Sequence, residues 1–443
     1  MAHVAAASGT PGATREGRAG TAGHQHLLVL GLCFATIVFD GYDLIVYGSV
    51  IPDLLEYEPW GLTPQRVGTI GSIALAGMLV GALAVGTLTD LIGRRKVLLV
   101  CLVWFSVAMG LCAVAPSAGL FAACRFLAGL GLGGVMPTTV ALTVEWAPKD
   151  RHHLFNALMF SGYSVGGVLA ALLAIWFLPD YGFRVLFALG ALPLITVVPL
   201  AFRYLPESRD FQPRAEKSVV SGAGGLRRAL PTTLFTRQRL VASVLFPLAS
   251  FCGLLLVYGL NTWLPKIMQK AGYPLTSALA FLVMLNVGAV IGALGGSAVA
   301  DRLGPKQVTA AGFLVAAGSV LLMSQGLSIG TLYVVVAAAG LGSVGTQILL
   351  NGYVASYYGP EHRASALGWT LGIGRLGAIL GPTVGGFLLA SSLGVDWNFY
   401  TFAVAAVAGA ILVALVPPAL GGTSPGYAES GPSDRTGSDE KDR

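Results

Sequence analysis

Residues 39–48 read FDGYDLIVYG, which places two carboxylates inside an apolar run that extends from Leu27 to about Ile51. Asp40 and Asp43 are three residues apart, so a helix carries both on one face, and Tyr47 extends that face. An ionised carboxylate is costly in hydrocarbon, so acids at this depth are functional candidates by default. The alternative is that such an acid makes a hydrogen bond between helices. This alternative explains two acids on one face less well than it explains a single acid.

The composition indicates an integral membrane protein. Of 443 residues, 55% are hydrophobic and 11% are charged, whereas soluble domains carry about a quarter charged residues. The net charge of +6 lies in loops between apolar runs, which argues against nucleic-acid binding. Apolar runs of about 20 residues predict an all-α fold with twelve spans, at 27–51, 67–89, 97–115, 118–145, 154–178, 182–202, 240–264, 275–300, 307–325, 330–357, 363–389 and 395–417.

The positive charges predict the orientation of these spans. With both termini on the inner side, four Lys or Arg residues fall in the outer loops, and nearly all the others fall on the inner side. Cytoplasmic loops carry the excess of Lys and Arg. We therefore expect a multi-pass protein with both termini in the cytoplasm. The outer four are Arg66, Arg184, Lys266 and Lys270.

The two halves of the chain repeat each other. The tripeptide at 46–48, the Asp-x-x-Gly at 90–93 and the Ala-Gly-Leu-Gly at 128–131 each recur 211 positions later. Such parallel repeats are typical of transporters that bind their substrate at the midplane between the halves. We predict a disordered segment 1–25, a six-helix bundle 26–202, a cytoplasmic linker 203–239, a second bundle 240–417 and a disordered tail 418–443.

The repeat also serves as a control for the two acids. The corresponding stretch of the second half, around residues 251–259, has no carboxylate. A helix at this place therefore packs without a charge, which favours a chemical role for Asp40 and Asp43.

Two arginines lie within the spans. Arg125 lies at about the depth of Asp43, roughly 10 Å below the outer end at 1.5 Å per residue, so the two can pair if their helices are neighbours. Arg375 lies near the middle of span 363–389, without an obvious acidic partner in its half. Because Arg binds carboxylates through two parallel hydrogen bonds, Arg375 suits an anionic ligand. The alternative is a cross-half ion pair of Arg375 with Asp40 or Asp43.

Any proton that crosses this protein must be carried by carboxylates, because all six histidines lie in tails or inner loops. Glu145, at the inner end of its span, is either a second protonatable site or a solvated helix end. Polar and aromatic side chains in the spans suit a cavity for a small, flat molecule with one charged end: Tyr42, Tyr47, Tyr163, Tyr258, Asn261, Asn286, Gln347, Asn351 and Trp369. No cluster of metal ligands is evident, and we expect neither a metal nor a cofactor.

The loop between the second and third spans reads GTLTDLIGRRK over residues 86–96, and residues 206–208 read PES. The loop resembles the gating motif of the major facilitator superfamily, with Leu91 in place of a basic residue. The copy at 301–306 is degenerate. In that superfamily the loop holds the inner gate closed through charge contacts between helix ends. The resemblance implies the superfamily's twelve-helix fold and gating roles for Gly86, Asp90, Gly93, Arg94 and Arg95.

The Asp40-Gly41-Tyr42-Asp43 element resembles the first-helix motif of the aromatic acid:proton symporters, a bacterial group of that superfamily that imports benzoate and hydroxybenzoates. The resemblance implies alternating access in the bacterial inner membrane, with an aromatic carboxylate and protons as partners, and we expect a monomer. Proton coupling is expected from Asp40, Asp43, Arg125 and Glu145, and substrate binding from Arg375, Tyr42, Tyr47, Tyr258, Asn351 and Trp369.

Three other functions are alternatives to import. An exporter of organic ions or drugs has the same fold, but the Gly-Pro of drug/proton antiporters is absent from residues 161–167. A membrane-embedded enzyme lacks a metal-ligand cluster and a Ser/His/Asp set. A non-transporting sensor needs an output domain, for which the linker 203–239 is too short.

Overall fold

A computed structural model describes residues 16–148, 152–206, 239–358 and 360–418. Within these ranges the chain is almost entirely helical, and twelve helical segments are long and apolar enough to cross a membrane. The predicted all-α membrane fold with twelve spans is therefore confirmed. The predicted disorder of residues 1–15 and 419–443, and most of the predicted linker, fall outside the described residues.

The first half contains six spans. Their helices are α1 (Glu16–Glu56), α2 (Pro64–Ile92), α3 (Arg94–Val114), α4 (Ala118–Trp146), α5 (His152–Tyr181), α6 (Phe183–Gly190) and α7 (Val197–Tyr204), with short 3₁₀ turns at Glu58–Trp60 and Leu192–Leu194.

The second half repeats this order. Its helices are α9 (Leu240–Lys270), α10 (Leu275–Leu303), α11 (Pro305–Met323), α12 (Ile329–Gly340), α13 (Thr346–Tyr357), α14 (Pro360–Ala390) and α15 (Asp396–Leu415). A π-helical segment, η3 (Leu341–Gly345), joins α12 to α13 within one span.

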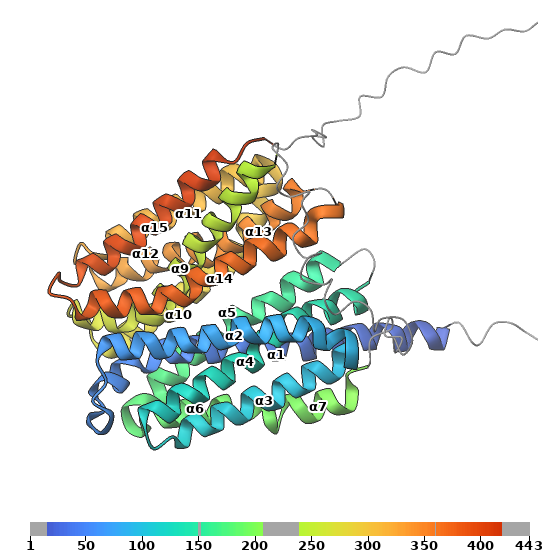
Figure 1. Cartoon of the computed structure of the whole chain (residues 1–443), viewed down its shortest axis with the longest axis horizontal. Coiled ribbons are helices and arrows are strands. Elements are labelled where there is room, and N and C mark those ends of the chain that lie inside the picture. The colour runs from blue at the N-terminus through green and yellow to red at the C-terminus, as the bar shows by residue number, and fades with distance from the viewer. Residues whose placement is uncertain (1–15, 149–151, 207–238, 359, 419–443) are drawn as a thin grey trace, which may run out of the picture.

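The two halves form separate bundles with matching internal packing (Figure 1). In the first half α1 packs on α5 and α2 on α4, and in the second half α9 packs on α14 and α10 on α12. The sequence repeat is therefore also a repeat of helix neighbours. Between the halves, α2 contacts α14, α5 contacts α10 and α1 contacts α9.

The span predicted at 182–202 is present as Phe183–Tyr204, but it is interrupted. It consists of α6, a 3₁₀ turn that contains Pro193, and α7, because proline lacks the amide hydrogen that a continuous helix needs. One predicted boundary is wrong. Residues 16–25, predicted to be disordered, already belong to α1. Extending an existing helix needs no new nucleus, and Ala, Glu and Arg in this segment favour helix.

We call the end of the molecule that carries the α2–α3 connection at Gly93 the inner end, and the opposite end the outer end. Polar contacts join the halves on the outer side. Ser72 of α2 donates to the Ile379 carbonyl and lies 2.6 Å from the Thr383 hydroxyl, both in α14. Lys266 of α9 lies 3.4 Å from Glu56 of α1.

Candidate transport site

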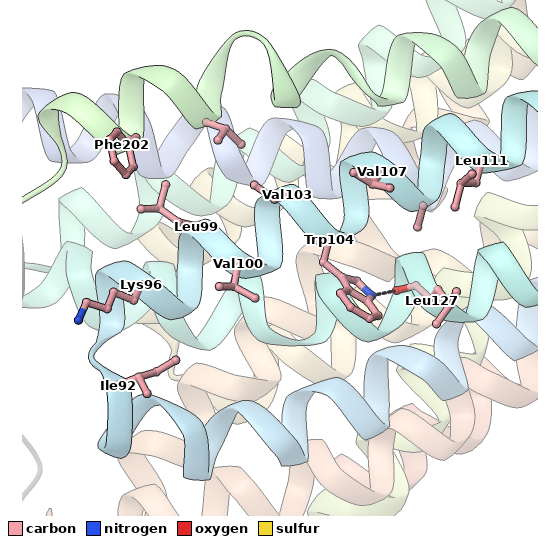
Figure 2. A pocket seen from close by; sticks show the side chains of 12 residues that line it. Ile92, Lys96, Leu99, Val100, Val103, Trp104, Val107, Leu111, Leu127 and Phe202 are labelled. Atoms are coloured by element: carbon pink, nitrogen blue, oxygen red, sulfur yellow. Dashed lines mark hydrogen bonds between the residues drawn. The ribbon is translucent and has the colours of Figure 1, made fainter.

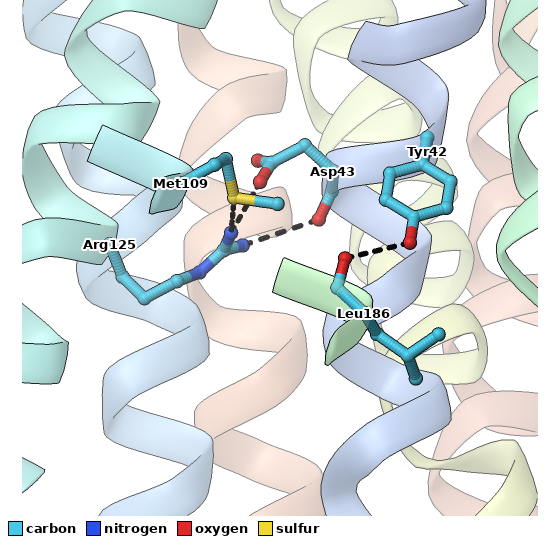
Figure 3. Close-up of polar contacts among 5 residues, drawn as sticks. All are labelled: Tyr42, Asp43, Met109, Arg125 and Leu186. Atoms are coloured by element: carbon cyan, nitrogen blue, oxygen red, sulfur yellow. Dashed lines mark hydrogen bonds and ion pairs between the residues drawn. The ribbon is translucent and has the colours of Figure 1, made fainter. Parts of the chain in front are cut away.

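A buried ion pair joins α1 to α4. Nη1 of Arg125 donates to Oδ1 of Asp43 at 2.6 Å, and each side chain is 2% exposed. Nη2 of Arg125 also reaches the Asp43 carbonyl oxygen at 3.4 Å, and Nη1 lies 3.6 Å from the sulfur of Met109 (Figure 3). The ion pair between Arg125 and Asp43 that the sequence predicts is therefore present.

Two predicted cavity residues, Tyr47 and Tyr42, instead surround this ion pair. The Tyr47 ring lies 5.3 Å from the Arg125 guanidinium, and its hydroxyl donates to the Val67 carbonyl at 2.6 Å. The Tyr42 hydroxyl donates to the Leu186 carbonyl at 2.8 Å (Figure 3). Both hydroxyls are thus committed to backbone acceptors within the first half.

Asp40 lies one helical turn before the paired Asp43 and has a different environment. It is completely buried, and within the described part of the chain neither of its carboxylate oxygens has a hydrogen-bond partner. The charge of Arg375, from the second half, is close enough to act on it. The two acids on the same helix face are therefore not equivalent, because one is neutralised by Arg125 and the other is left without a bonded partner.

A cavity of about 270 Å³ lies between the halves beside Asp40. Tyr163 of α5 and Tyr258 of α9 both line it, one from each half. The full lining is Leu75, Met136, Phe160, Tyr163, Ser164, Leu254, Val257, Tyr258, Val344, Gln347, Ile348, Asn351, Leu371, Arg375 and Ala378.

The cavity is closed on its outer side. Ser72 of α2 contacts Ile379 and Thr383, and all three lie on the outer side of the lining residues of their own helices, Leu75 in α2 and Ala378 in α14. At the inner end, the polar contacts of Arg94 with Glu145 and of Trp369 with Ser243 stay within one half. The outer side of the cavity is therefore where the described polar contacts between the halves lie.

Arg375 supplies the cationic group of this cavity. Its side chain is half-buried, and it forms no hydrogen bond or ion pair with any residue the structure describes. The alternative that Arg375 forms an ion pair with Asp40 or Asp43 is therefore wrong for this conformation. Its five donors are available to a ligand.

Three of the predicted substrate residues line the cavity together: Arg375, Tyr258 and Asn351. Tyr42, Tyr47 and Trp369 do not line it, and the prediction that they do is wrong. Trp369 lies nearer the inner end, where its indole donates to the Ser243 carbonyl at 2.9 Å. Asn261 and Asn286 also lie outside the lining, because both amides bond to carbonyls of their own helices.

Ser164 and the apolar lining residues were not predicted. The apolar residues could not be predicted, because the sequence does not distinguish a Leu or Met that faces lipid from one that faces the cavity. Ser164 was detectable as a polar residue in the span beside Tyr163.

The predicted gating residues lie at the inner end. Arg94, at the start of α3, lies 3.0 Å from Glu145, which is 7% exposed at the end of α4. The idea that Glu145 is a solvated helix end is therefore wrong. Arg95 donates to the Phe202 carbonyl, and Gly93 makes the sharp turn between α2 and α3 with φ of +93°. Gly86 and Asp90 belong to α2, but the contacts of the Asp90 side chain lie outside the described part.

A larger hollow of about 990 Å³ lies on the side of the first bundle, along α3, α4 and α7 (Figure 2). Apart from Lys96 at one end, its lining is apolar and includes exposed Val100, Val103 and Phe202. Trp104 in its wall donates to the Leu127 carbonyl at 2.9 Å. It shares no lining residue with the cavity that contains Arg375, so it is not the candidate site.

The fold and site define a multi-pass membrane transporter with a central cavity between two six-span bundles. The sequence matches the Major Facilitator Superfamily over residues 33–307 and 284–436. The chain therefore belongs to that superfamily and, by its relatives, to its aromatic acid transporters; it is a transporter and not an enzyme.

Two similar proteins are 39% identical to the chain. One is the benzoate transport protein of Acinetobacter baylyi, and the match spans 88% of this chain and 89% of that protein. The other is the gentisate transporter of Corynebacterium glutamicum, and the match spans 86% of this chain and 85% of that protein. Among solved structures, the D-xylose–proton symporter matches with a TM-score of 0.72 at 16% identity, over 89% of this chain and 98% of its own. That likeness confirms the fold.

Proposed function

We propose that this protein imports a small aromatic carboxylate of the benzoate or hydroxybenzoate class, by proton symport with alternating access. Its place is the bacterial cytoplasmic membrane, with the inner end and both termini in the cytoplasm. One observation carries the proposal: Arg375, without a partner among the described residues, lines a cavity shared by both halves next to the unpartnered acid Asp40.

Arg375 is the proposed carboxylate site. A carboxylate that enters the cavity loses water, and two charge-assisted hydrogen bonds from a planar guanidinium replace that hydration. The ring then lies against aromatic and aliphatic lining residues such as Phe160, Tyr258 and Leu254. The apolar walls contribute affinity through buried area and discriminate little between rings.

Asp40 is the proposed proton site, with Asp43 and Arg125 as its fixed neighbours. A substrate carboxylate at Arg375 adds a negative charge close to Asp40. A proton on Asp40 removes the resulting repulsion, so substrate and proton favour each other's binding. By linkage the effect is reciprocal, which is the thermodynamic requirement for symport. Tyr163 and Tyr258 line the cavity near Asp40, and they offer hydroxyl groups along which the proton can pass.

Alternating access is proposed to exchange the outer contacts of Ser72 for new contacts at the inner end. Arg94, Glu145 and the rest of the 86–96 loop then hold the inner gate. Because one chain supplies the whole cavity, we propose a monomer as the transporting unit.

Uptake into proteoliposomes tests the proposal. With the lumen alkaline and the outside acidic, labelled benzoate or hydroxybenzoate should accumulate above equilibrium, and collapsing the pH gradient with an ionophore should abolish the accumulation. Substrate that moves only outward against a gradient would favour the exporter. Binding without flux in either direction would favour a sensor.

A further inference from the structure

Two carboxamides line the cavity together with Arg375. Gln347 and Asn351 both line the cavity, and they lie four residues apart in α13, so they share one helix face. Oε1 of Gln347 and Oδ1 of Asn351 are buried without a hydrogen-bond partner within the described chain. A buried polar atom without a partner is destabilising, which points to a ligand that supplies one.

The Gln347 side chain is held in place by its surroundings. It is 6% exposed, and its Nε2 donates to the Ser250 hydroxyl of α9 at 3.0 Å. A Cβ at position 253, one turn further along α9, would lie 2.4 Å from its Oε1, so Gly253 leaves the space that this oxygen occupies. The amide therefore has a fixed orientation before any ligand binds.

The backbone before these residues is also unusual. The π-helical segment η3 ends at Gly345, one residue before α13 begins. Such a segment inserts an extra residue and turns the following helix face, and π-bulges are frequent at functional sites. Here the turned face carries Gln347 and Asn351 into the cavity lining.

We propose that Gln347 and Asn351 form a specificity-determining subsite for a hydroxyl group on the ring of the substrate. This inference rests on the proposed function, because Arg375 binds the carboxylate of the same molecule. A phenolic hydroxyl both donates and accepts, so it pairs with either end of a carboxamide. The apolar lining residues around the amides have no such group to offer.

The subsite makes the cavity selective against unsubstituted rings. A site that hydrogen-bonds a substrate hydroxyl discriminates strongly against the analogue without it, because its buried polar groups are then left unpaired. An unsatisfied buried group corresponds to about a tenfold loss of affinity or more. We therefore expect hydroxybenzoates to bind at least about tenfold more tightly than benzoate.

Thermal-shift titration of the purified full chain tests the subsite. Benzoate, 3-hydroxybenzoate, 4-hydroxybenzoate and 2,5-dihydroxybenzoate are compared on the wild type, on Gln347→Met and on Asn351→Leu. Both variants keep the approximate side-chain volume. We expect each to lower the affinity for the best hydroxylated acid more than the affinity for benzoate, so that the preference for the hydroxylated acid falls severalfold. Leu254→Met, which alters an apolar lining residue, should change all affinities together and leave the preference unchanged.

The outcomes separate this inference from the proposed function. Equal affinities of the wild type for benzoate and all hydroxybenzoates would overturn the subsite while leaving aromatic carboxylate binding intact. The same holds if both variants retain the wild-type preference. If no ring acid stabilises the wild type, the proposed function itself fails.

Discussion

The guanidinium of Arg125 lies 2.6 Å from the carboxylate of Asp43, and both side chains are shielded from water and lipid inside the first bundle. Two charges in so apolar a place are tolerated because each neutralises the other. The pair joins α1 to α4, whereas Asp40 has no hydrogen-bond partner among the described residues. We therefore propose Asp40 as the proton site, with Asp43 and Arg125 as its fixed neighbours.

The first prediction concerns that ion pair. Asp43→Leu or Arg125→Met alone leaves one buried charge without its partner, which is expected to lower stability by about 3–5 kcal/mol. The double variant removes both charges and should recover most of that loss without recovering proton-driven uptake. Melting temperatures of the three variants in detergent measure this. Additive losses in the double variant would show that the pair is not coupled.

Asp40 should show the opposite pattern. Because its oxygens have no bonded partner within the described residues, Asp40→Asn breaks no contact and should leave the melting temperature close to that of the wild type. Asn cannot cycle a proton, so accumulation driven by a pH gradient should be lost while counterflow exchange continues. Asp180→Asn, at the exposed outer end of α5, is the matched control and should retain both activities. Full accumulation by Asp40→Asn would exclude Asp40 as the proton site.

The outer closure depends on close contact of α1 with α9. A Cβ at Gly48 would lie 2.0 Å from the Asn261 carbonyl oxygen, so Gly48→Ala should push the outer ends of the halves apart. Spin labels at Glu58 and Ala271 in a cysteine-free background should then report a longer distance than in the parent. Gly119→Ala is the control, since a Cβ there meets nothing within 4 Å. An unchanged distance in Gly48→Ala would mean that the closure tolerates the extra carbon.

Glu145 is expected to act in the gate. Glu145→Gln weakens its contact with Arg94, so we expect transport turnover to fall severalfold while equilibrium binding of the aromatic acid changes little. Turnover and binding are measured on the same proteoliposome preparation. Loss of binding with normal turnover per bound molecule would instead place Glu145 in the substrate or proton site.

The charged residues of the site could be predicted from the sequence. Arg125 and Asp43 could be paired in advance because opposite charges at equal depth in apolar helices have few other ways to be stabilised. Arg375 stood out because nothing acidic in its own half matched it. Burial of a charge in hydrocarbon is so unfavourable that even a single sequence reveals it.

The direction of uncharged side chains could not be predicted in the same way. Tyr42 and Tyr47 share the helix of Asp40, but whether their rings face the cavity or Arg125 depends on how α1 is rotated against α4 and α6. Similarly, Gln347 and Asn351 reach the cavity after the π-helical turn at Leu341–Gly345. A sequence with regular helical periodicity gives no sign of that shift.

Arg375 is proposed to bind the anionic group of an aromatic acid, and competition by the neutral amide tests this role most directly. In proteoliposomes that transport labelled benzoate, we predict that unlabelled benzoate competes and that benzamide, which has the same ring but no anionic group, fails to compete at a hundredfold excess. Equal competition by benzamide and benzoate would contradict the account, because the cavity would then recognise the ring without the carboxylate.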